Sequence, residues 1–280
     1  MRRETVEPLR LASADNIPEE SPMRARTKNP VLAPSLRAAM IGLALICLAA
    51  LAACGSSSSA TRPATSPTAT HAASVIYVAL GASDAVGVGA ADPNTQGYVP
   101  VLISRLPKDA DALNLGVSGY KVHDALQKKM RAALNAHPTL VTVWLAGNDF
   151  RGCTLRNSYI ADLNSLLDQL KSGTKAQVFV ANLPDMSLLP AMRPGSQGLG
   201  ACHQTQTSQQ MRTETQTWNA AIAQAVSSHG DDLIDLYRAE LASHPEYISG
   251  DGFHPTAAGY LRLADLFWAD IQAKHAIPAA

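Results

Sequence analysis

The chain alternates short apolar runs with segments of helical periodicity, and this alternation is the strongest constraint on its fold. The apolar runs lie at residues 75–80, 112–117, 139–145, 177–183 and 232–237. Stripes of apolar residues at helical spacing lie at residues 123–136, 159–170, 218–226 and 257–271. Short apolar runs separated by helices are typical of parallel strands that are covered on both faces. The pattern predicts an α/β domain, a three-layer α/β/α sandwich with a parallel sheet of about five strands.

The charge balance bears on the kind of partner. The 280 residues include 23 Lys and Arg against 23 Asp and Glu. A nucleic-acid binder normally carries a basic patch, and a domain close to neutrality lacks it. We therefore expect no nucleic-acid partner.

The N-terminal region has the pattern of an export signal. Residues 38–53 are almost entirely apolar, follow Arg24, Arg26, Lys28 and Arg37, and end in Leu51-Ala52-Ala53-Cys54. The apolar stretch is short for a membrane span, which favours a secretory signal. The last four residues resemble a bacterial lipoprotein signal, which implies that Cys54 is diacylated and becomes the mature N-terminus. An ordinary signal peptide or a short anchor with an incidental Cys is the alternative.

These features divide the chain into three parts. Residues 1–54 form an N-terminal extension and lipoprotein signal peptide, in which Met23 would be a more typical start. Residues 55–73 are rich in Ser, Thr, Pro and Ala without periodicity, as in a flexible tether. Residues 74–280 form the folded domain. We expect it to be exported and held by lipidated Cys54 at the bacterial cell envelope, on the periplasmic or extracellular face.

Two cysteines, Cys153 and Cys202, remain in the folded domain. An exported domain with two cysteines favours one disulfide over two free buried thiols, the alternative. A metal site is disfavoured, because no second Cys or His lies at ligand spacing beside either one. The disulfide would hold the Pro- and Gly-containing segment 186–207, predicted as a long loop, beside the loop after the third strand.

Four short blocks carry the residues with catalytic chemistry. They are Gly81-Ala82-Ser83-Asp84, residues 114–119 (Asn-Leu-Gly-Val-Ser-Gly), residues 146–149 (Ala-Gly-Asn-Asp) and residues 251–255 (Asp-Gly-Phe-His-Pro). The first three follow predicted strands and the last precedes the final helix. Since the carboxyl ends of parallel strands share one edge of the sheet, the four blocks can converge there.

Chemistry assigns a role to each block. Ser83 needs a base to become a nucleophile, and His254 is the candidate, oriented by Asp251. The backbone N–H groups of Ser83 and Gly119 and the side chain of Asn148 are candidate oxyanion donors. Taken singly, Ser83 is more typical of a helix cap, and the other residues are common in turns and at helix starts. Their joint occurrence in this order favours catalysis.

The four blocks together resemble the SGNH (GDSL-type) hydrolases over about residues 74–275. Matched to the family's motif, the residues are Ser83, Gly119, Asn148 and His254, with Asp251 in its Asp-x-x-His. The resemblance implies a flavodoxin-like fold and ester hydrolysis without a metal or other cofactor. The chain departs from the pattern at Ala82 and Asp84, which flank the nucleophile, and in having its glycine immediately before Asn148.

The resulting hypothesis is an exported, membrane-tethered serine esterase that acts on a lipid, lysophospholipid or acetylated-glycan ester. We assume a monomer. Two alternatives remain open. One is a catalytically silent envelope lipoprotein that binds acylated glycans. The other is a metal phosphoesterase that uses Asp84, Asp149, Asp251 and His254.

Overall fold

Five parallel strands form one sheet in the order β2-β1-β3-β4-β5 in the computed structural model, which describes residues 74–277. The strands are β1 (Ile76–Gly81), β2 (Asp111–Asn114), β3 (Leu140–Trp144), β4 (Gln177–Ala181) and β5 (Asp232–Ile234). Each overlaps one of the predicted apolar runs. The predicted parallel sheet is therefore confirmed.

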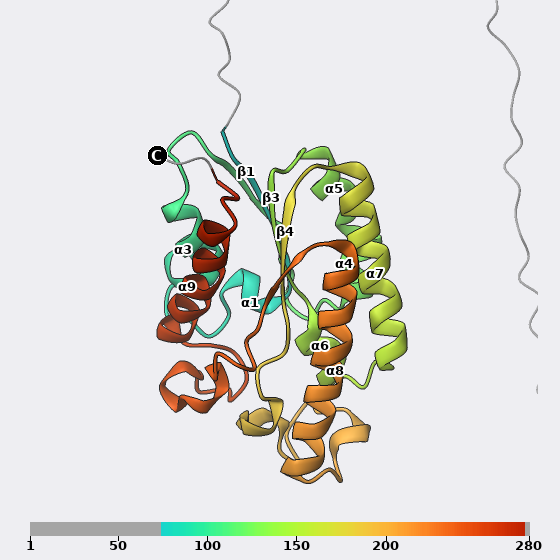
Figure 1. Ribbon diagram of the computed structural model, residues 1–280. Coiled ribbons are helices and arrows are strands. Elements are labelled where there is room, and N and C mark those ends of the chain that lie inside the picture. Colours follow the sequence, from blue (N-terminus) through green and yellow to red (C-terminus); the bar gives the residue numbers. More distant parts are fainter. Residues whose placement is uncertain (1–73, 278–280) are drawn as a thin grey trace, which may run out of the picture. The chain divides into compact units, whose positions relative to one another are not determined.

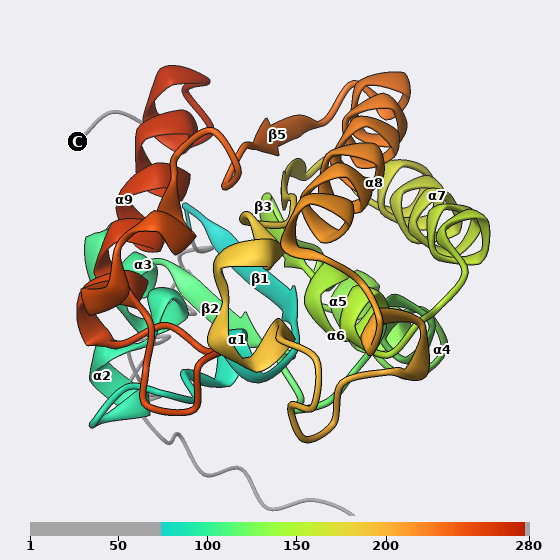
Figure 2. The ribbon, with the colours of Figure 1, turned by 90° about the horizontal axis from the view of Figure 1, so that it is seen from below.

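Helices cover both faces of this sheet, as Figures 1 and 2 show. On one face lie α3 (Tyr98–Arg105) and α9 (Ala257–Ala273), and on the other lie α4 (Val122–Lys128), α5 (Met130–Asn135), α7 (Arg156–Gly173) and α8 (Ser208–His229). Three short helices, α1 (Ser83–Val86), α2 (Pro93–Gln96) and α6 (Ala146–Arg151), complete the set among the described residues. The three-layer α/β/α architecture predicted from the alternation is confirmed.

Strand geometry explains why the sheet has two separate cores. Successive side chains of a strand point to opposite faces. In β1, Val78 and Leu80 pack into the core beneath α4, α7 and α8, while Tyr77 and Ala79 pack into the core beneath α3 and α9. All four are buried, and this accounts for the continuous apolar run in the sequence.

Helix boundaries differ from the prediction where local signals are weak. The helix expected over 218–226 is the C-terminal part of α8, which begins at Ser208. Thr207 caps it, and the Thr207 and Gln210 side chains bond each other's backbone N–H groups in a capping box. The helix expected over 123–136 is divided into α4 and α5 at Lys129, whose φ is −116°.

The segment 186–207, called here the long segment, is folded onto the domain. It contains three short 3₁₀ turns, Met186–Leu188, Pro190–Met192 and Ala201–His203. Met186, Leu189, Met192 and Leu199 are buried in the core that α8 covers. The predicted loop is therefore a packed wall of the domain.

Several sequence predictions concern residues outside those described. They are the N-terminal extension and signal peptide at 1–54, the start at Met23, the lipidated Cys54 and the linker at 55–73. Within residues 74–277, no helix combines the length and the apolar character needed to span a membrane.

Replacing Leu163 with Ala tests the packing of α7. Leu163 is fully buried in the core between α7 and the sheet. Deleting a buried leucine side chain leaves a cavity and should lower the free energy of unfolding by about 2–5 kcal/mol. Leu155→Ala, at a residue that is 75% exposed next to the same helix, should change it by less than about 0.5 kcal/mol. Urea denaturation of both variants measures this, and equal losses would contradict the packing described.

Candidate active site

The candidate site lies where the strand order reverses between β1 and β3. The chain passes from β1 to β2 on one side and then to β3 on the other side of β1. In open parallel sheets, ligands bind at the carboxyl ends of the strands beside such a reversal. Ser83 follows β1 directly as the first residue of α1, and Asn148 follows β3 within α6. The topology thus brings the first and third sequence blocks to one crevice.

Ser83, His254 and Asp251 form a continuous hydrogen-bonded chain. The Ser83 Oγ lies 2.8 Å from His254 Nε2. The His254 Nδ1 lies 2.5 Å from Asp251 Oδ2. Ser83 is buried, whereas the side chains of His254 and Asp251 are 16% and 45% exposed. The structure therefore gives these three residues the geometry of a nucleophile, a base and an orienting carboxylate.

Asp251 is held as a carboxylate by several donors. Its Oδ1 accepts hydrogen bonds from the backbone N–H groups of Phe253 and His254 and from the hydroxyl of Ser249, at 2.8–2.9 Å. Partial burial acts to raise the pKa of the Asp251 carboxyl, but these bonds and the His254 ring outweigh it and hold the pKa well below its ordinary value. Sequence reasoning missed Ser249, although a hydroxyl two residues before the Asp was a visible signal.

Gly89 fixes the position of the His254 loop. Its φ is +100°, in the region that favours glycine, and a Cβ at this residue would lie 2.4 Å from the Pro255 carbonyl oxygen. The same Cβ would lie 3.0 Å from the Cβ of His254. Only a residue without a side chain lets the segment after α1 pack so closely against the His254 loop. This role was not predicted, because it arises from a contact between distant segments.

The three predicted oxyanion residues lie on adjoining elements. Asn148 Nδ2 donates a hydrogen bond of 3.0 Å to the carbonyl of Tyr120, which joins α6 to the loop that holds Gly119. Gly119 has φ +82°, and no atom lies within 4 Å of where its Cβ would be, so its face is open to a ligand. The N–H of Ser83, at the first position of α1, has no carbonyl acceptor in its own helix.

Asp84 and a small cavity lie immediately beside the nucleophile. The cavity has a volume of about 30 Å³ and is lined by Asp84, Gly147, Phe253 and Pro255, together with apolar residues of the long segment. These four residues are the chain neighbours of Ser83, Asn148 and His254. Burial raises the pKa of the Asp84 carboxyl to about 6, against the attraction of His254.

The carboxylates of the phosphoesterase alternative do not gather. Asp149 is buried and accepts a hydrogen bond of 2.8 Å from the N–H of Val122 at the start of α4. Within residues 74–277, three or more His, Cys, Asp or Glu side chains bring their donor atoms close together at one place. These side chains are Cys153, Cys202 and His203. Both sulfurs of that set are in a disulfide, and a metal ligand must be a thiolate.

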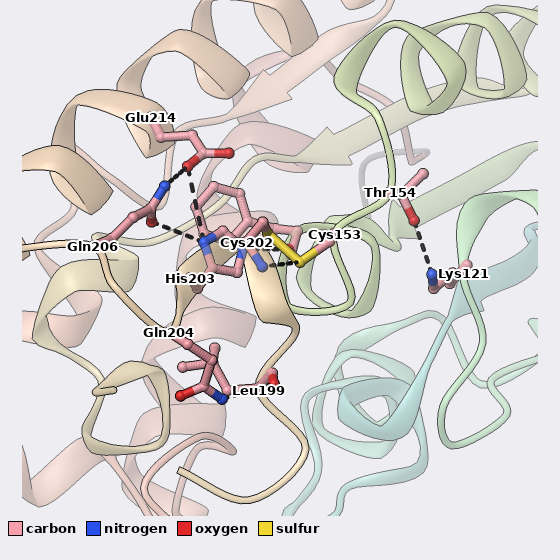
Figure 3. Close-up of a disulfide and its surroundings, with 10 residues drawn as sticks. Lys121, Cys153, Thr154, Leu199, Cys202, His203, Gln204, Gln206 and Glu214 are labelled. Atoms are coloured by element: carbon pink, nitrogen blue, oxygen red, sulfur yellow. Dashed lines mark hydrogen bonds and ion pairs between the residues drawn. A yellow bond between two sulfur atoms is a disulfide. The ribbon is translucent and has the colours of Figure 1, made fainter. Parts of the chain in front are cut away.

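The disulfide between Cys153 and Cys202 attaches the long segment to the end of α6 (Figure 3). Its Cα atoms are 6.0 Å apart. Beside it, the N–H of Gly200 donates a bond of 2.9 Å to the carbonyl of Arg151. A Cβ on Gly200 would lie only 2.3 Å from the Cys153 sulfur, so glycine is needed here. The predicted pairing and the predicted attachment are both present.

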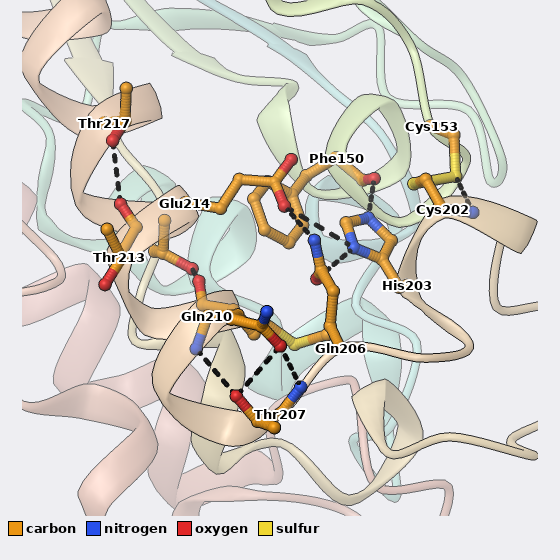
Figure 4. Close-up of polar contacts among 12 residues, drawn as sticks. Phe150, Cys153, Cys202, His203, Gln206, Thr207, Gln210, Thr213, Glu214 and Thr217 are labelled. Atoms are coloured by element: carbon orange, nitrogen blue, oxygen red, sulfur yellow. Dashed lines mark hydrogen bonds and ion pairs between the residues drawn. A yellow bond between two sulfur atoms is a disulfide. The ribbon is translucent and has the colours of Figure 1, made fainter.

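A buried histidine strengthens this attachment (Figure 4). His203 Nε2 lies 2.7 Å from the carbonyl oxygen of Phe150, and Nδ1 lies 2.8 Å from Gln206 Oε1. The amide nitrogen of Gln206 donates a hydrogen bond to Glu214. This bond holds the Gln206 amide with its oxygen toward the His203 ring. Both ring nitrogens of His203 therefore have a hydrogen-bond partner. An oxygen of Glu214 lies 3.8 Å from Nδ1 of His203.

Comparison with protein families gives a match over most of the chain. The model of the GDSL-like lipase/acylhydrolase family matches residues 37–262. Among curated protein sequences, none matches the chain.

Solved structures with the same fold include three hydrolases. A lipase/acylhydrolase from Enterococcus faecalis has 17% identity and a TM-score of 0.54, covering 71% of this chain and 96% of its own. The esterase EstA from Pseudoalteromonas sp. has 17% identity and a TM-score of 0.54, covering 71% and 97%. The acetylxylan esterase Axe2 from Geobacillus stearothermophilus has 18% identity and a TM-score of 0.55, covering 70% and 94%. At these identities the likeness shows a common fold.

Replacing Asp149 with Asn tests the electrostatics of α6. Burial raises the pKa of the Asp149 carboxyl to about 6 from 3.8. A carboxyl whose pKa is raised by folding lowers the free energy of unfolding as it ionises. Its full contribution to that free energy is present below pH 4 and is lost as the pH rises through 6. The Asn variant keeps an acceptor for Val122 and has no charge to bury. Its free energy of unfolding, relative to wild type, should therefore increase by about 1–3 kcal/mol from pH 4 to pH 7.

Chemical denaturation at several pH values checks this prediction. The other titrating groups are shared by the two proteins, so their effects cancel in the difference. Parallel pH profiles for the wild type and the variant would show that Asp149 has an ordinary pKa.

Proposed function

Because the chain belongs to the GDSL-like lipase/acylhydrolase family, we propose that it is a serine esterase that hydrolyses carboxylic esters with Ser83 as the nucleophile. The observation that carries this proposal is the 2.8 Å hydrogen bond between Ser83 Oγ and His254 Nε2. A serine hydroxyl becomes nucleophilic when an adjacent base takes its proton.

Acylation is the first step. Ser83 Oγ attacks the carbonyl carbon of the ester while His254 Nε2 takes the hydroxyl proton. Asp251 is ionised and stabilises the imidazolium that forms. The tetrahedral intermediate then collapses, the bond to the alcohol oxygen breaks, and His254 returns its proton to the leaving alcohol. The acyl group remains on Ser83.

Deacylation repeats these steps with water. His254 takes a proton from a water molecule, whose oxygen attacks the acyl carbon. Collapse of the second intermediate releases the carboxylic acid, and His254 returns the proton to Ser83. In both steps the negative oxygen would be bound by the N–H groups of Ser83 and Gly119 and by Asn148. The bond from Asn148 to Tyr120 uses one amide N–H and leaves the other for the oxyanion.

The cavity beside Ser83 supports a choice among the ester substrates. Its volume of about 30 Å³ is far below the ~300–1,000 Å³ of pockets that hold drug-sized ligands, which suits a short acyl group. The apolar lining from Leu183, Met186 and Leu189 suits a methyl group. We therefore favour an acetyl ester, such as an acetylated glycan, over a long-chain lipid. The same fold carries a protein named as an acetylxylan esterase.

We also propose that the enzyme works outside the cytoplasm, tethered through lipidated Cys54. The support is the sequence pattern of residues 38–54 and the linker at 55–73. The disulfide between Cys153 and Cys202 is compatible with this, since disulfides persist in oxidising compartments. Export of a Cys54→Ala variant without membrane retention would support the lipid anchor.

Ser83→Ala tests the nucleophile. Without the hydroxyl no acyl-enzyme forms, and turnover of 4-nitrophenyl acetate should fall by at least about a thousandfold. Ser104→Ala, an exposed serine on α3, is the matched control and should keep wild-type turnover. Circular dichroism shows whether each variant is folded. A folded Ser83→Ala variant with wild-type turnover would show that another group attacks the ester.

A series of nitrophenyl esters tests the acyl preference. If the cavity holds the acyl group, kcat/KM should be highest for acetate and fall by about tenfold or more by butyrate, because each extra methylene must displace packed side chains. A preference for octanoate would instead indicate a lipid substrate. Failure of the wild type to hydrolyse any ester would favour the silent glycan-binding lipoprotein.

A further inference from the structure

A second, larger cavity adjoins the candidate active site on the side of His254. Its volume is about 480 Å³, and we call it the outer groove. Its lining includes Asp251, Phe253 and His254 from the loop before α9, Ser196 and Gln197 from the long segment, and Arg151 from α6. Phe253 lines both the outer groove and the small cavity beside Asp84. The two cavities therefore adjoin each other at Phe253, next to His254 in the chain.

Arg151 is held in one orientation in this groove. Its guanidinium carbon lies 4.9 Å from the centroid of the Phe253 ring. Its Nη2 donates a bond of 2.5 Å to the carbonyl of Gln197. Gly198, with φ +74°, approaches so closely that a Cβ there would lie 3.3 Å from the same nitrogen. These contacts reduce the entropy that the side chain would lose on binding a ligand.

The charge of Arg151 is not matched by a carboxylate. None of the ion pairs among residues 74–277 includes Arg151. Its Nε is buried and has no hydrogen-bond partner within that part of the chain. A guanidinium has five N–H groups, and the bond to Gln197 uses one of them. Because Nε is buried, the donors left for a ligand are those of Nη1 and the second N–H of Nη2, and Arg151 offers them together with its charge.

Asp251 also lines the outer groove, but its carboxylate is already engaged. The His254 ring occupies Oδ2, and three further donors occupy Oδ1. Asp84 lines the small cavity and is not part of the outer groove. Arg151 is therefore the charged side chain of this groove that remains available to a substrate.

The proposed mechanism determines which part of the substrate enters the groove. His254 gives its proton to the oxygen of the leaving alcohol, so that oxygen must lie at His254 when the bond breaks. The acyl group is accommodated beside Asp84 and Gly147. The alcohol consequently extends past His254 into the outer groove.

We propose that Arg151 selects esters whose alcohol part carries an anionic oxygen group, a carboxylate or a phosphate. This inference rests on the esterase function proposed above. A guanidinium group binds a carboxylate or a phosphate in the same way. Two of its N–H groups, lying in one plane, donate to two oxygens of the anion. An acidic sugar unit and a phosphorylated polyol are the two sources of such an alcohol. Arg151 is a substrate-binding residue in this proposal and takes no part in proton transfer.

Matched acetyl esters test the proposal. The purified protein is assayed with 4-acetoxybenzoate and with 4-acetoxybenzamide. These two esters differ in charge and have nearly the same shape. For the wild type, kcat/KM should be higher for the anion, and Arg151→Gln should lower it about 10- to 100-fold for the anion and less than about threefold for the amide. Arg151→Lys should retain part of the preference. Acetyl esters of glycerol phosphate and of a methyl glucuronoside then distinguish phosphate from carboxylate.

Two controls separate recognition from a structural role. Arg193→Gln changes an exposed arginine on the same long segment and should leave the ratio between anion and amide unchanged. Raising NaCl to 1 M should reduce the ratio in the wild type and not in Arg151→Gln, because salt screens the charge. Equal losses on both esters in Arg151→Gln and Arg151→Lys would overturn the proposal while leaving the esterase function intact. Absence of all ester hydrolysis in the wild type would overturn both.

Discussion

The hydrogen bond between Ser83 and His254 is the interaction on which the site depends, and it joins residues 171 positions apart. No local signal can create it. It requires β1 to lie inside the sheet, between β2 and β3, and the loop before α9 to fold back over the carboxyl end of that strand. The hydrogen bond from the Tyr260 hydroxyl to the carbonyl of Val88, at 2.6 Å, ties α9 to the segment after α1. The close packing of Gly89 against His254 completes this connection.

Two carboxyl groups near the imidazole have opposite environments. Asp251 is partly exposed and accepts four hydrogen bonds, which keep it ionised. Asp84 lies in an apolar cavity, where burial raises its pKa to about 6. Environment thus keeps Asp251 ionised beside His254 and gives Asp84 a pKa of about 6, so the two carboxyl groups titrate in different pH ranges. Two of the departures from the family's usual pattern, Asp84 and Gly147, line the small cavity, which under the proposed function links them to specificity more than to the chemical step.

Periodicity and residue type predicted the sheet, its strands, the disulfide and the residues that converge at its edge. Those features are readable because burial of both sheet faces imposes long apolar runs and because Ser, His and Asp carry distinctive chemistry. The helix α3, the full length of α8 and the packed state of the long segment were missed, since tertiary contacts determine them. Gly89 and Arg151 were missed for the same reason, whereas Ser249 had a local signal that was overlooked. Each acts through a neighbour that is distant in sequence or through a hydrogen bond that only the fold defines.

The helix α6 links the catalytic residues to the outer groove. Its six residues include both the oxyanion candidate Asn148 and the groove residue Arg151. A helix this short is not stable by itself. Its C-terminal end is held by the Cys153–Cys202 disulfide, by the bond from His203 to Phe150 and by the bond from Gly200 to Arg151. The long segment therefore does more than border the groove. It supports the helix that carries both the oxyanion candidate and the proposed anion-binding side chain, so the proposed acyl chemistry and alcohol recognition depend on one structural support.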